Sequence, residues 1–298
     1  KPIGYPSDNE VIGGILCLWP DVNLEKETDA IAQNPVYSSL LTYAWATWTA
    51  DVTQAPEKYY ATLPQKGNPA LTYFHAFEEI LVHHKEKFFA NEPFPYYLQS
   101  DKNWQVIGFF NGNDGDKILA ESKTTYAYQE DLLTWKDAVG NTLIINDRFR
   151  LGGYFPKATA GQTVYAKTFI YSDKKRNIDT WIGFETPMRS NRTYTGIPAT
   201  GKWEANGGGI WVNDESLPAP NWENPGWKPS RSEGWPPPEE QELSWQKEEL
   251  YWTRKPTTIA LKKGWNKVFA KIPCSSSYQN WMFTFIPRNM EGLHFSIK

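Results

Sequence analysis

Short apolar runs separated by turn-forming residues fill the chain from Trp104 onward. They are rich in β-branched and aromatic residues, which favour strands. The runs are WQVIGFF (104–110), NTLIINDRF (141–149), QTVYAKTFIYS (162–172), TWIGFE (180–185), GGIWVN (208–213), TTIALKKG (257–264), NKVFAKIP (266–273) and NWMFTFIP (280–287). Turn signals such as Gly140-Asn141 and Lys263-Gly264 separate them. This spacing predicts a β-sandwich of roughly eight strands, with a jelly roll as the expected type.

Helical spacing dominates the N-terminal part of the chain. Asn34-Pro35 and Asn68-Pro69 each pair an N-cap residue with a proline suited to the first helical turn. Apolar residues then recur at helical intervals, which predicts one helix from there to about Ala50 and another toward Lys87. Residues 91–103, NEPFPYYLQSDKN, are predicted to be a proline-marked linker.

The apolar run GGILCLWPDV (13–22) is predicted to be a buried strand, although periodicity alone also allows a buried helical segment. Pro20 ends the run because it has no N–H to donate. Trp19 and Asp21 would then lie at the strand's C-terminal end, where α/β folds bind ligands. An indole beside a carboxylate suits a sugar ring. The alternative is a core tryptophan and a solvated turn aspartate.

Composition narrows the classes of partner. Trp alone accounts for 15 residues and the aromatic content is 15%, which favours β packing and exposed aromatic platforms such as those of sugar-binding proteins. The net charge of −3 argues against nucleic acid and anionic membranes as partners. The chain has no apolar run of about eighteen residues, so no membrane span is expected. Its two cysteines, Cys17 and Cys274, cannot form a disulfide framework, and Cys17 is expected to be a buried thiol.

The stretch EVIGGILCLWPDV and the following NPVYSSLLTYAWATW resemble the last strand and helix of the barrel in family 20 glycoside hydrolases, the β-N-acetylhexosaminidases. The resemblance covers roughly residues 10–50 and lies in Gly13, Gly14, Cys17, Trp19, Asp21 and Trp48. It implies that Trp19 is the floor of the sugar pocket and that Asp21 accepts hydrogen bonds from sugar hydroxyls. The family usually has glutamate where this chain has Asp21, which is one methylene shorter.

Residues 160–275 resemble the C-terminal accessory sandwich of bacterial family 20 enzymes and related galactose-binding-like modules. The similarity lies in TWIGF, GKWEANGGGIWVND and the segment from YWTRKP to KIP. In such modules the Lys-Gly-Trp-Asn sequence forms a hairpin turn. We therefore interpret Lys263–Asn266 as specifying the fold rather than binding a ligand.

The resemblance implies a substrate-assisted mechanism, in which the acetamido oxygen of the substrate attacks the anomeric carbon. The family uses an Asp-Glu pair after the fourth barrel strand. Here Asp-Glu occurs only at Asp214-Glu215 and the reverse order at Glu130-Asp131, both outside the barrel portion. Neither is assigned a catalytic role, and no cofactor is expected. A complete barrel needs about 250 residues, so this chain alone is expected to be inactive.

A proline-rich loop at residues 214–242 carries Trp222, Trp227 and Trp235. These residues could line a glycan groove, or they could anchor a long loop to the sandwich, which is the favoured interpretation. Metal sites have weak support. His75 and Glu79 offer a two-ligand helix face at best, and Asp114 and Asp116 fit a polar turn better than a calcium loop.

The sequence thus predicts a mainly β chain with an α/β start. Residues 1–90 would be the end of an incomplete (β/α)₈ barrel, 91–103 a linker and 104–298 the accessory sandwich. The expected activity is that of the C-terminal part of an enzyme that removes terminal N-acetylhexosamine from glycans. Its expected partners are such a glycan and the rest of the barrel. The resemblance favours a secreted, periplasmic or cell-surface bacterial location. The alternatives are a non-catalytic carbohydrate-binding module and a structural brace for an enzyme domain.

Overall fold

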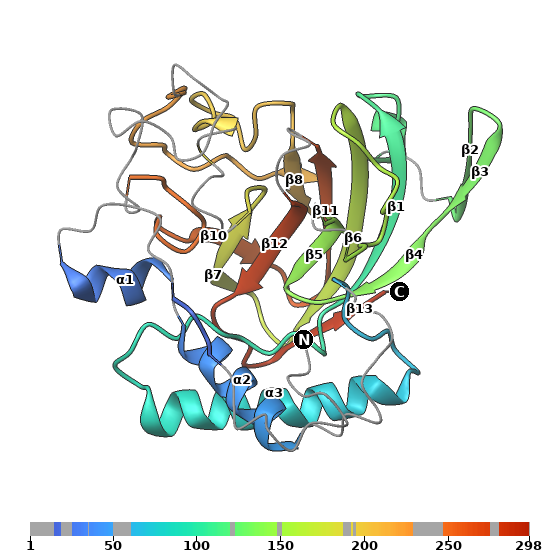
Figure 1. The fold of residues 1–298 in the computed structure, drawn as a ribbon. Coiled ribbons are helices and arrows are strands. Elements are labelled where there is room, and N and C mark those ends of the chain that lie inside the picture. Colours follow the sequence, from blue (N-terminus) through green and yellow to red (C-terminus); the bar gives the residue numbers. More distant parts are fainter. Residues whose placement is uncertain are drawn as a thin grey trace.

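The computed structural model describes residues 15–18, 26–34, 36–49, 61–119, 123–147, 151–186, 192, 195–228, 247–274 and 280–297. Over these residues the protein is mainly β, as predicted. Two antiparallel sheets form the body, and the helices α2 and α3 lie below it in Figure 1.

The larger sheet has seven strands in the order β4-β1-β6-β11-β8-β9, with β13 also paired to β6. Its long central strands, β6 and β11, run antiparallel with Gly264 opposite Ser172 and Pro273 opposite Thr163. The strands span Asn103–Asn111 (β1), Lys136–Val139 (β4), Gln162–Ser172 (β6), Gly209–Val212 (β8), Glu215–Ser216 (β9), Gly264–Pro273 (β11) and Leu293–Ser296 (β13).

The smaller sheet has four strands in the order β10-β7-β12-β5. They span Thr257–Leu261 (β10), Arg176–Gly183 (β7), Trp281–Pro287 (β12) and Thr142–Asn146 (β5). A separate hairpin of β2 (Thr125–Tyr128) and β3 (Asp131–Thr134) projects from the side of the body in Figure 1. A 3₁₀ turn, η2 (Asp116–Leu119), precedes that hairpin.

One hydrophobic core lies between the two sheets and takes residues from both of them. Trp104 of β1 is fully buried, and its ring meets Phe283 and Phe285 of β12 edge-on at 5.9 and 5.6 Å between centroids. Such edge-to-face aromatic pairs add stabilisation beyond the area they bury. Aromatic side chains therefore join the large sheet to the small one.

All eight apolar runs after residue 103 contain strands, which confirms the strand predictions for β1, β5, β6, β7, β8, β10, β11 and β12. The prediction of a hairpin at Lys263-Gly264 is wrong, because β10 pairs with β7 and β11 pairs with β6 and β8. The turn instead carries the chain from one sheet to the other. Gly264 has φ of +91°, which glycine adopts without strain.

Asn266 holds this crossover turn in place. Its side chain is fully buried, its Oδ1 accepts from Lys262 N at 2.9 Å, and its Nδ2 donates to the carbonyls of Lys262 and Gly264 at 2.9 and 3.0 Å. Asn213 donates to the same Oδ1 from the β8–β9 turn at 2.9 Å. These contacts satisfy backbone groups at the turn, so Asn266 has a structural role.

The helices are α1 (Glu27–Gln33), α2 (Tyr37–Thr49) and α3 (Pro69–Phe88). The helix predicted from Asn68-Pro69 is confirmed, and Asn68 Oδ1 accepts from Ala70 N at 2.9 Å as an N-cap should. The helix ending near Ala50 is also confirmed, but Asn34 does not start it. Asn34 instead follows the last residue of α1, a short helix that the sequence did not predict.

The predicted buried strand at residues 13–22 is contradicted where the structure describes it. Residues 15–18 form neither helix nor strand, and Ile15 is 86% exposed. Cys17, expected to be buried, is exposed. Gly13, Gly14, Trp19 and Asp21 lie outside the described residues. Among the described helices none is both long enough and apolar enough to cross a bilayer.

Candidate functional site

The predicted sugar-binding pair, Trp19 and Asp21, lies outside the described residues, as does Trp235 of the long loop. Their roles stay predictions. The described part of the molecule places two of the predicted site residues, Trp222 and Trp227. It also reveals a polar cleft that sequence reasoning missed.

Trp222 is only 8% exposed, and both its indole ring and its Nε1 make contacts within the protein. Its Nε1 donates to the carbonyl of Lys202 at 2.9 Å. The guanidinium groups of Arg254 and Arg192 lie over the ring, 4.9 and 5.5 Å from its centroid. Cation–π contacts of this kind stabilise a partly desolvated arginine. This geometry is that of a loop anchor rather than of an open platform for a sugar.

Arg192 and Arg254 form hydrogen bonds that hold the segments around Trp222 together. Arg192 donates to the carbonyls of Glu248 and Glu249 at 2.7 and 3.0 Å. The Glu249 carboxylate accepts in turn from the backbone N–H groups of Glu223 and Asn224 at 2.7 and 3.1 Å. Residues 222–224 and 248–254 are therefore held to each other by charge-assisted hydrogen bonds.

Glu185 lies at the bottom of this network and is almost fully buried. Its Oε1 accepts from Arg254 Nη1 at 2.6 Å, and its Oε2 accepts from Phe184 N at 3.0 Å. Burial alone would raise the pKa of this carboxyl. The charges of Arg254 and Arg192 outweigh burial, and the net pKa of Glu185 lies below its ordinary value. The group is thus a carboxylate paired inside the protein, not a proton donor for catalysis.

Trp227 is half-buried, and its backbone rather than its ring makes the described contacts. Its carbonyl accepts from Ile197 N at 2.8 Å, and its N–H donates to Asn224 O at 3.1 Å. Trp227 and the neighbouring Lys228 pack closely against Gly196, whose φ is +66°. The contacts hold the 224–228 segment against the 196–198 segment.

A cleft of about 470 Å³ opens where the start of β7 meets the end of β12. Five of its six lining residues are polar or charged; the lining is Arg176, Asn177, Ile178, Asp179, Arg288 and Asn289. Its size falls within the range of small-molecule sites. The register explains the juxtaposition, because Pro287 pairs with Thr180 and Arg288 N donates to Asp179 O at 2.9 Å.

The two arginines of the cleft are positioned by different contacts. Arg288 has its guanidinium 5.0 Å from the centroid of Trp181. Arg176 donates from Nη1 to the carbonyl of Glu291 at 2.6 Å, and its Nη2 pairs with Asp173. Arg176 Nε is buried and meets no acceptor among the described residues. Sequence reasoning missed this site because Arg176 begins β7 and Arg288 follows the end of β12, and these positions are far apart in the chain.

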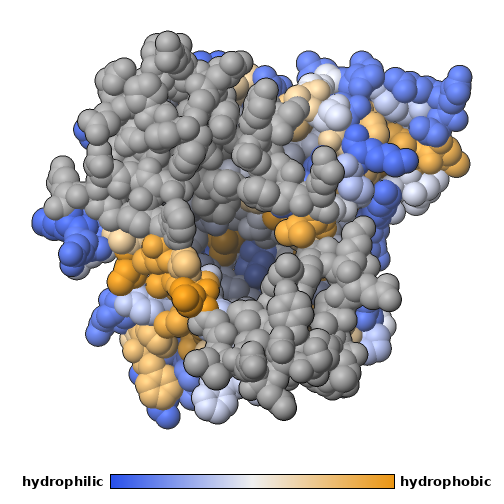
Figure 2. Space-filling view, viewed as in Figure 1, coloured by the Kyte–Doolittle hydropathy of each residue, from blue (hydrophilic) through white to orange (hydrophobic). Residues whose placement is uncertain are grey.

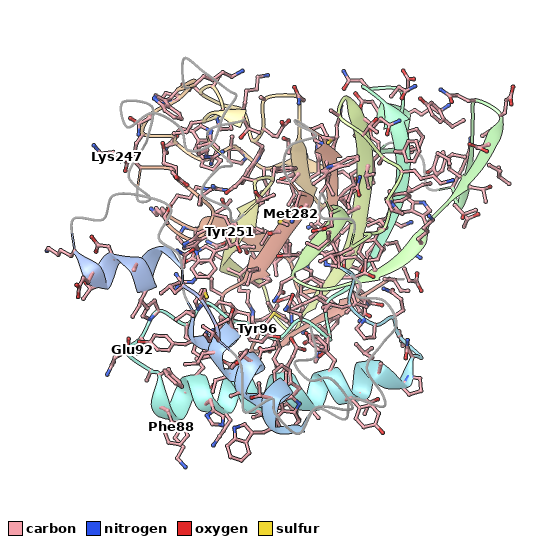
Figure 3. The ribbon with its side chains drawn as sticks, viewed as in Figure 1. Phe88, Glu92, Tyr96, Lys247, Tyr251 and Met282 are labelled. Carbon is pink, nitrogen blue, oxygen red and sulfur yellow. The ribbon has the colours of Figure 1, made fainter. Side chains whose placement is uncertain are left out.

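The helical layer is joined to the β body through Glu78 of α3, which is fully buried. Its carboxylate accepts from Tyr96 Oη at 2.5 Å, Gln99 N at 2.8 Å and Ser100 N at 2.9 Å. Burial and the Glu78 charge raise the pKa of Tyr96, which keeps the phenol protonated as the donor. Figure 3 places Tyr96 between α3 and the sheets.

Residues 97–102 continue this connection into the smaller sheet. Asn141 Nδ2 donates to the carbonyls of Tyr97 and Leu98 at 3.1 and 3.0 Å. The ring of Tyr97 meets Trp181 of β7 edge-on at 5.6 Å. The residues predicted to be a linker therefore form hydrogen-bonded contacts with both α3 and the β body, while the division into domains stays a prediction.

The outer side of the helical layer is apolar. Five residues of α3 follow the i, i+4, i+7, i+11, i+15 spacing of one helix face; they are Tyr73, Phe77, Ile80, His84 and Phe88. Tyr73 is 80% exposed and Phe88 59% exposed. Phe88 points away from the body in Figure 3, and apolar atoms gather at the lower left of Figure 2.

Helix α2 extends this apolar surface. Trp45 packs against Phe77 with ring centroids 5.6 Å apart, yet it is still largely exposed. Trp48, one of the residues that carries the family resemblance, is 90% exposed, and Leu40 lies on the same helix. We call the set Leu40, Trp45, Trp48, Tyr73, Ile80 and Phe88 the helical face. Large apolar side chains exposed on two helices in contact are a feature of protein interfaces.

The remaining acidic and metal-site candidates have other partners. Asp214 lies in the β8–β9 turn and pairs with Lys267, and Glu215 begins β9 opposite Val212. Asp116 accepts from Tyr165 Oη at 2.7 Å and pairs with Lys271 at 2.6 Å, and Asp114 accepts from Tyr128 at 2.9 Å. His75 lies 3.5 Å from Glu79 and shares a hydrogen bond with Ser100. No group of three or more metal-ligating side chains occurs among the described residues.

Comparison with protein-family models, with curated proteins and with solved structures finds no match for this chain.

Proposed function

We propose that the chain is the C-terminal part of a family 20-like β-N-acetylhexosaminidase. Residues 1–90 would close its barrel, and the two-sheet body would be its jelly-roll, galactose-binding-like accessory domain. The parent enzyme hydrolyses terminal N-acetylhexosamine residues of glycans by the substrate-assisted retaining route. Trp19 forms the floor of its sugar pocket and Asp21 accepts sugar hydroxyls.

The observation that carries the proposal is the exposed helical face. Trp48 and Tyr73 leave most of their side chains in water, although α3 is fixed to the β body by the buried carboxylate of Glu78. A firmly held helix gains nothing by exposing aromatic residues to water, since burying each would contribute about 1.5–3 kcal/mol. The other strands and helices of a barrel would cover this face, as the resemblance over residues 10–50 implies.

The proposal assigns no acid to this chain, because its one Asp-Glu sequence, Asp214-Glu215, lies in the β body rather than in the barrel portion. The proton donor would be the glutamate of an Asp-Glu pair elsewhere in the barrel. A donor of that kind must reach the glycosidic oxygen and hold a raised pKa. Glu185, the most buried ion-paired carboxylate of the loop network, has a lowered pKa instead.

The test compares the full-length gene product with the 298-residue chain on p-nitrophenyl N-acetyl-β-glucosaminide. We expect turnover by the full-length protein and none by the chain. Trp19→Ala and Asp21→Asn in the full-length protein should each lower kcat/KM by about 10- to 100-fold, which is the loss of one stacking or charged hydrogen-bond contact. The corresponding glucoside serves as the specificity control.

Two outcomes would overturn this assignment. Robust turnover by the chain alone would show that the acid lies within it. A folded full-length protein without activity on any N-acetylhexosaminide would remove the hydrolase function. A second candidate, a non-catalytic carbohydrate-binding module, is favoured by the cleft at Arg176 and Arg288 and predicts glycan binding without hydrolysis. A third, a brace without a ligand of its own, shares the exposed helical face but predicts no glycan binding by the β body.

A further inference from the structure

We propose that the cleft between Arg176 and Arg288 binds an acidic saccharide, through a carboxylate or sulfate group on the sugar. The saccharide class rests on the proposed function, that is, on the protein acting on glycans. The preference for a negative charge rests on the cleft alone. All six lining residues belong to the β body, so the cleft would be a second glycan site besides the one proposed at Trp19 and Asp21.

Arg288 is the cation of the cleft that is available to an anion. Arg288 forms no ion pair with the described carboxylates; its guanidinium rests on Trp181. Arg176 is paired with Asp173, which is not part of the lining, and Asp179 is the one carboxylate among the six lining residues. Lys85 of α3 is close enough to Arg288 to feel its charge, which adds to the positive potential. An arginine fork binds carboxylate and sulfate oxygens with two parallel hydrogen bonds.

The arrangement of Arg176 indicates a built site rather than a chance pair of surface cations. Its side chain is mostly buried, and Nε has no acceptor among the described residues, which is costly for a buried charged donor. The loop after β12 is shaped around it. Gly292 has φ of +69°, and a Cβ there would lie 2.7 Å from Arg176 Nη2.

The other polar side chains of the cleft can form hydrogen bonds with the hydroxyl groups of a sugar. Asp179 Oδ1 accepts from Thr258 at 2.9 Å, which leaves Oδ2 as an acceptor for a sugar hydroxyl. Asn289 Oδ1 accepts from Glu291 N at 2.9 Å, which leaves its amide N–H groups as donors. Asn177 is exposed and adds a second amide. Donors and acceptors around a pair of cations fit a hydroxylated anion better than a bare inorganic one.

Binding to the 298-residue chain is measured by calorimetry with four probes. They are an unsulfated uronate–N-acetylhexosamine disaccharide, N-acetylglucosamine 6-sulfate, neutral N,N′-diacetylchitobiose and inorganic sulfate. We expect one or both acidic sugars to bind, with affinity falling as salt rises. Comparing the first two probes distinguishes carboxylate from sulfate recognition. Equal binding of the neutral disaccharide would overturn the preference for acidic sugars, and inorganic sulfate binding as tightly as the acidic sugars would overturn the saccharide class.

Arg288→Met keeps an unbranched chain over Trp181 but removes the charge. It should weaken binding of the acidic sugar by roughly tenfold or more, and Arg288→Lys should weaken it less. Lys157→Met, at an exposed cation on the loop before β6, is the matched control and should leave affinity unchanged. Because Arg288 is exposed, the fold should survive, as thermal unfolding would verify. Unchanged affinity in a folded Arg288→Met variant would overturn the proposal.

The test of the cleft can fail or succeed independently of the test of the proposed hydrolase. Arg288→Met in the full-length protein should leave hydrolysis of the chromogenic N-acetylglucosaminide intact. Failure of the acidic sugars to bind, with hydrolysis retained, would refute the cleft alone. Binding by the cleft without any hydrolysis would refute the hydrolase and retain the glycan-binding module.

Discussion

The carboxylate of Glu78 accepts a hydrogen bond from the backbone N–H of Ser100 at 2.9 Å, deep between α3 and the β body. Both residues are buried, so no water replaces this bond if either partner is lost. The contact converts a helix with modest apolar burial into a fixed layer. The strength of this connection can be measured.

Glu78→Ala should destabilise the protein by about 2–4 kcal/mol, because it leaves two backbone N–H groups and the Tyr96 hydroxyl without their acceptor. Urea unfolding would give the free-energy change, and hydrogen exchange should show lost protection at Gln99 and Ser100. Glu79→Ala, one residue along the same helix and exposed, is the control and should stay within about 0.5 kcal/mol of the native protein. Equal effects of both changes would contradict the role of Glu78.

Arg254→Ala should cost about 3–5 kcal/mol, because it strands the buried Glu185 carboxylate and removes a cation from the Trp222 ring. Thermal or urea unfolding measures this loss. Lys255→Ala, at the next and exposed position, should have little effect. A loss below about 1 kcal/mol for Arg254→Ala would show that the ion pair is dispensable.

The Glu185 carboxyl should make stability depend on pH in the acid range. Its pKa in the folded protein lies below the ordinary value of about 4.3, so its charged form contributes stability above that pH. The contribution is lost as pH falls through the folded-state pKa. Glu185→Gln should therefore differ from the native protein by a constant amount between about pH 5 and 7, and the difference should shrink below about pH 4. A difference that stayed constant down to pH 3 would show that the pKa is not lowered.

Replacing Trp48 and Tyr73 together by Gln should change the free energy of unfolding of the isolated chain by no more than about 1 kcal/mol, since both side chains are already in water. The same change should reduce binding of a hydrophobic dye and any self-association seen by sedimentation. In the full-length protein it should destabilise the fold, because the barrel would cover the helical face. A variant that leaves the full-length protein unaffected would argue that nothing covers this face.

Asn266→Ala should destabilise by about 2–3 kcal/mol, because the buried amide bridges backbone groups at the turn between the two sheets. Asn206→Ala, at an exposed position before β8, provides the comparison and should be nearly neutral. Unfolding in urea distinguishes the two. Near-neutral behaviour of Asn266→Ala would mean that the turn is held by Gly264 alone.

Much of the β body was predictable because its central strands combine β-branched and aromatic residues in runs with turns between them. Strand β6 begins and ends at the predicted residues, Gln162 and Ser172. Short or polar edge strands gave no such signal. Lys136–Val139 has two charged or polar residues among four, and Glu215–Ser216 is a two-residue strand created by the turn before it.

Other features depend on contacts between distant segments. The sequence suggested a hairpin at Lys263-Gly264, but local turn chemistry cannot tell whether flanking strands share a sheet. The apolar run at 15–18 was read as buried because its residues are apolar, yet they are exposed in this chain. The cleft required Arg176 and Arg288 to meet, which follows from the β7–β12 register and from no local motif.

The turn from Gly264 to Asn266 is one of the places where a single stretch of backbone joins both layers of the β body; the β4–β5 and β6–β7 connections are others. The helical layer is connected through Glu78 and residues 97–102 to Asn141, which directly precedes β5 of the small sheet. From there the connection continues to the large sheet, both along the backbone and through the packed rings of Trp104, Phe283 and Phe285. If the proposed barrel covers α2 and α3, it would therefore be held at a fixed angle to the Arg288 cleft, and a ligand bound in the cleft would have one orientation relative to the barrel.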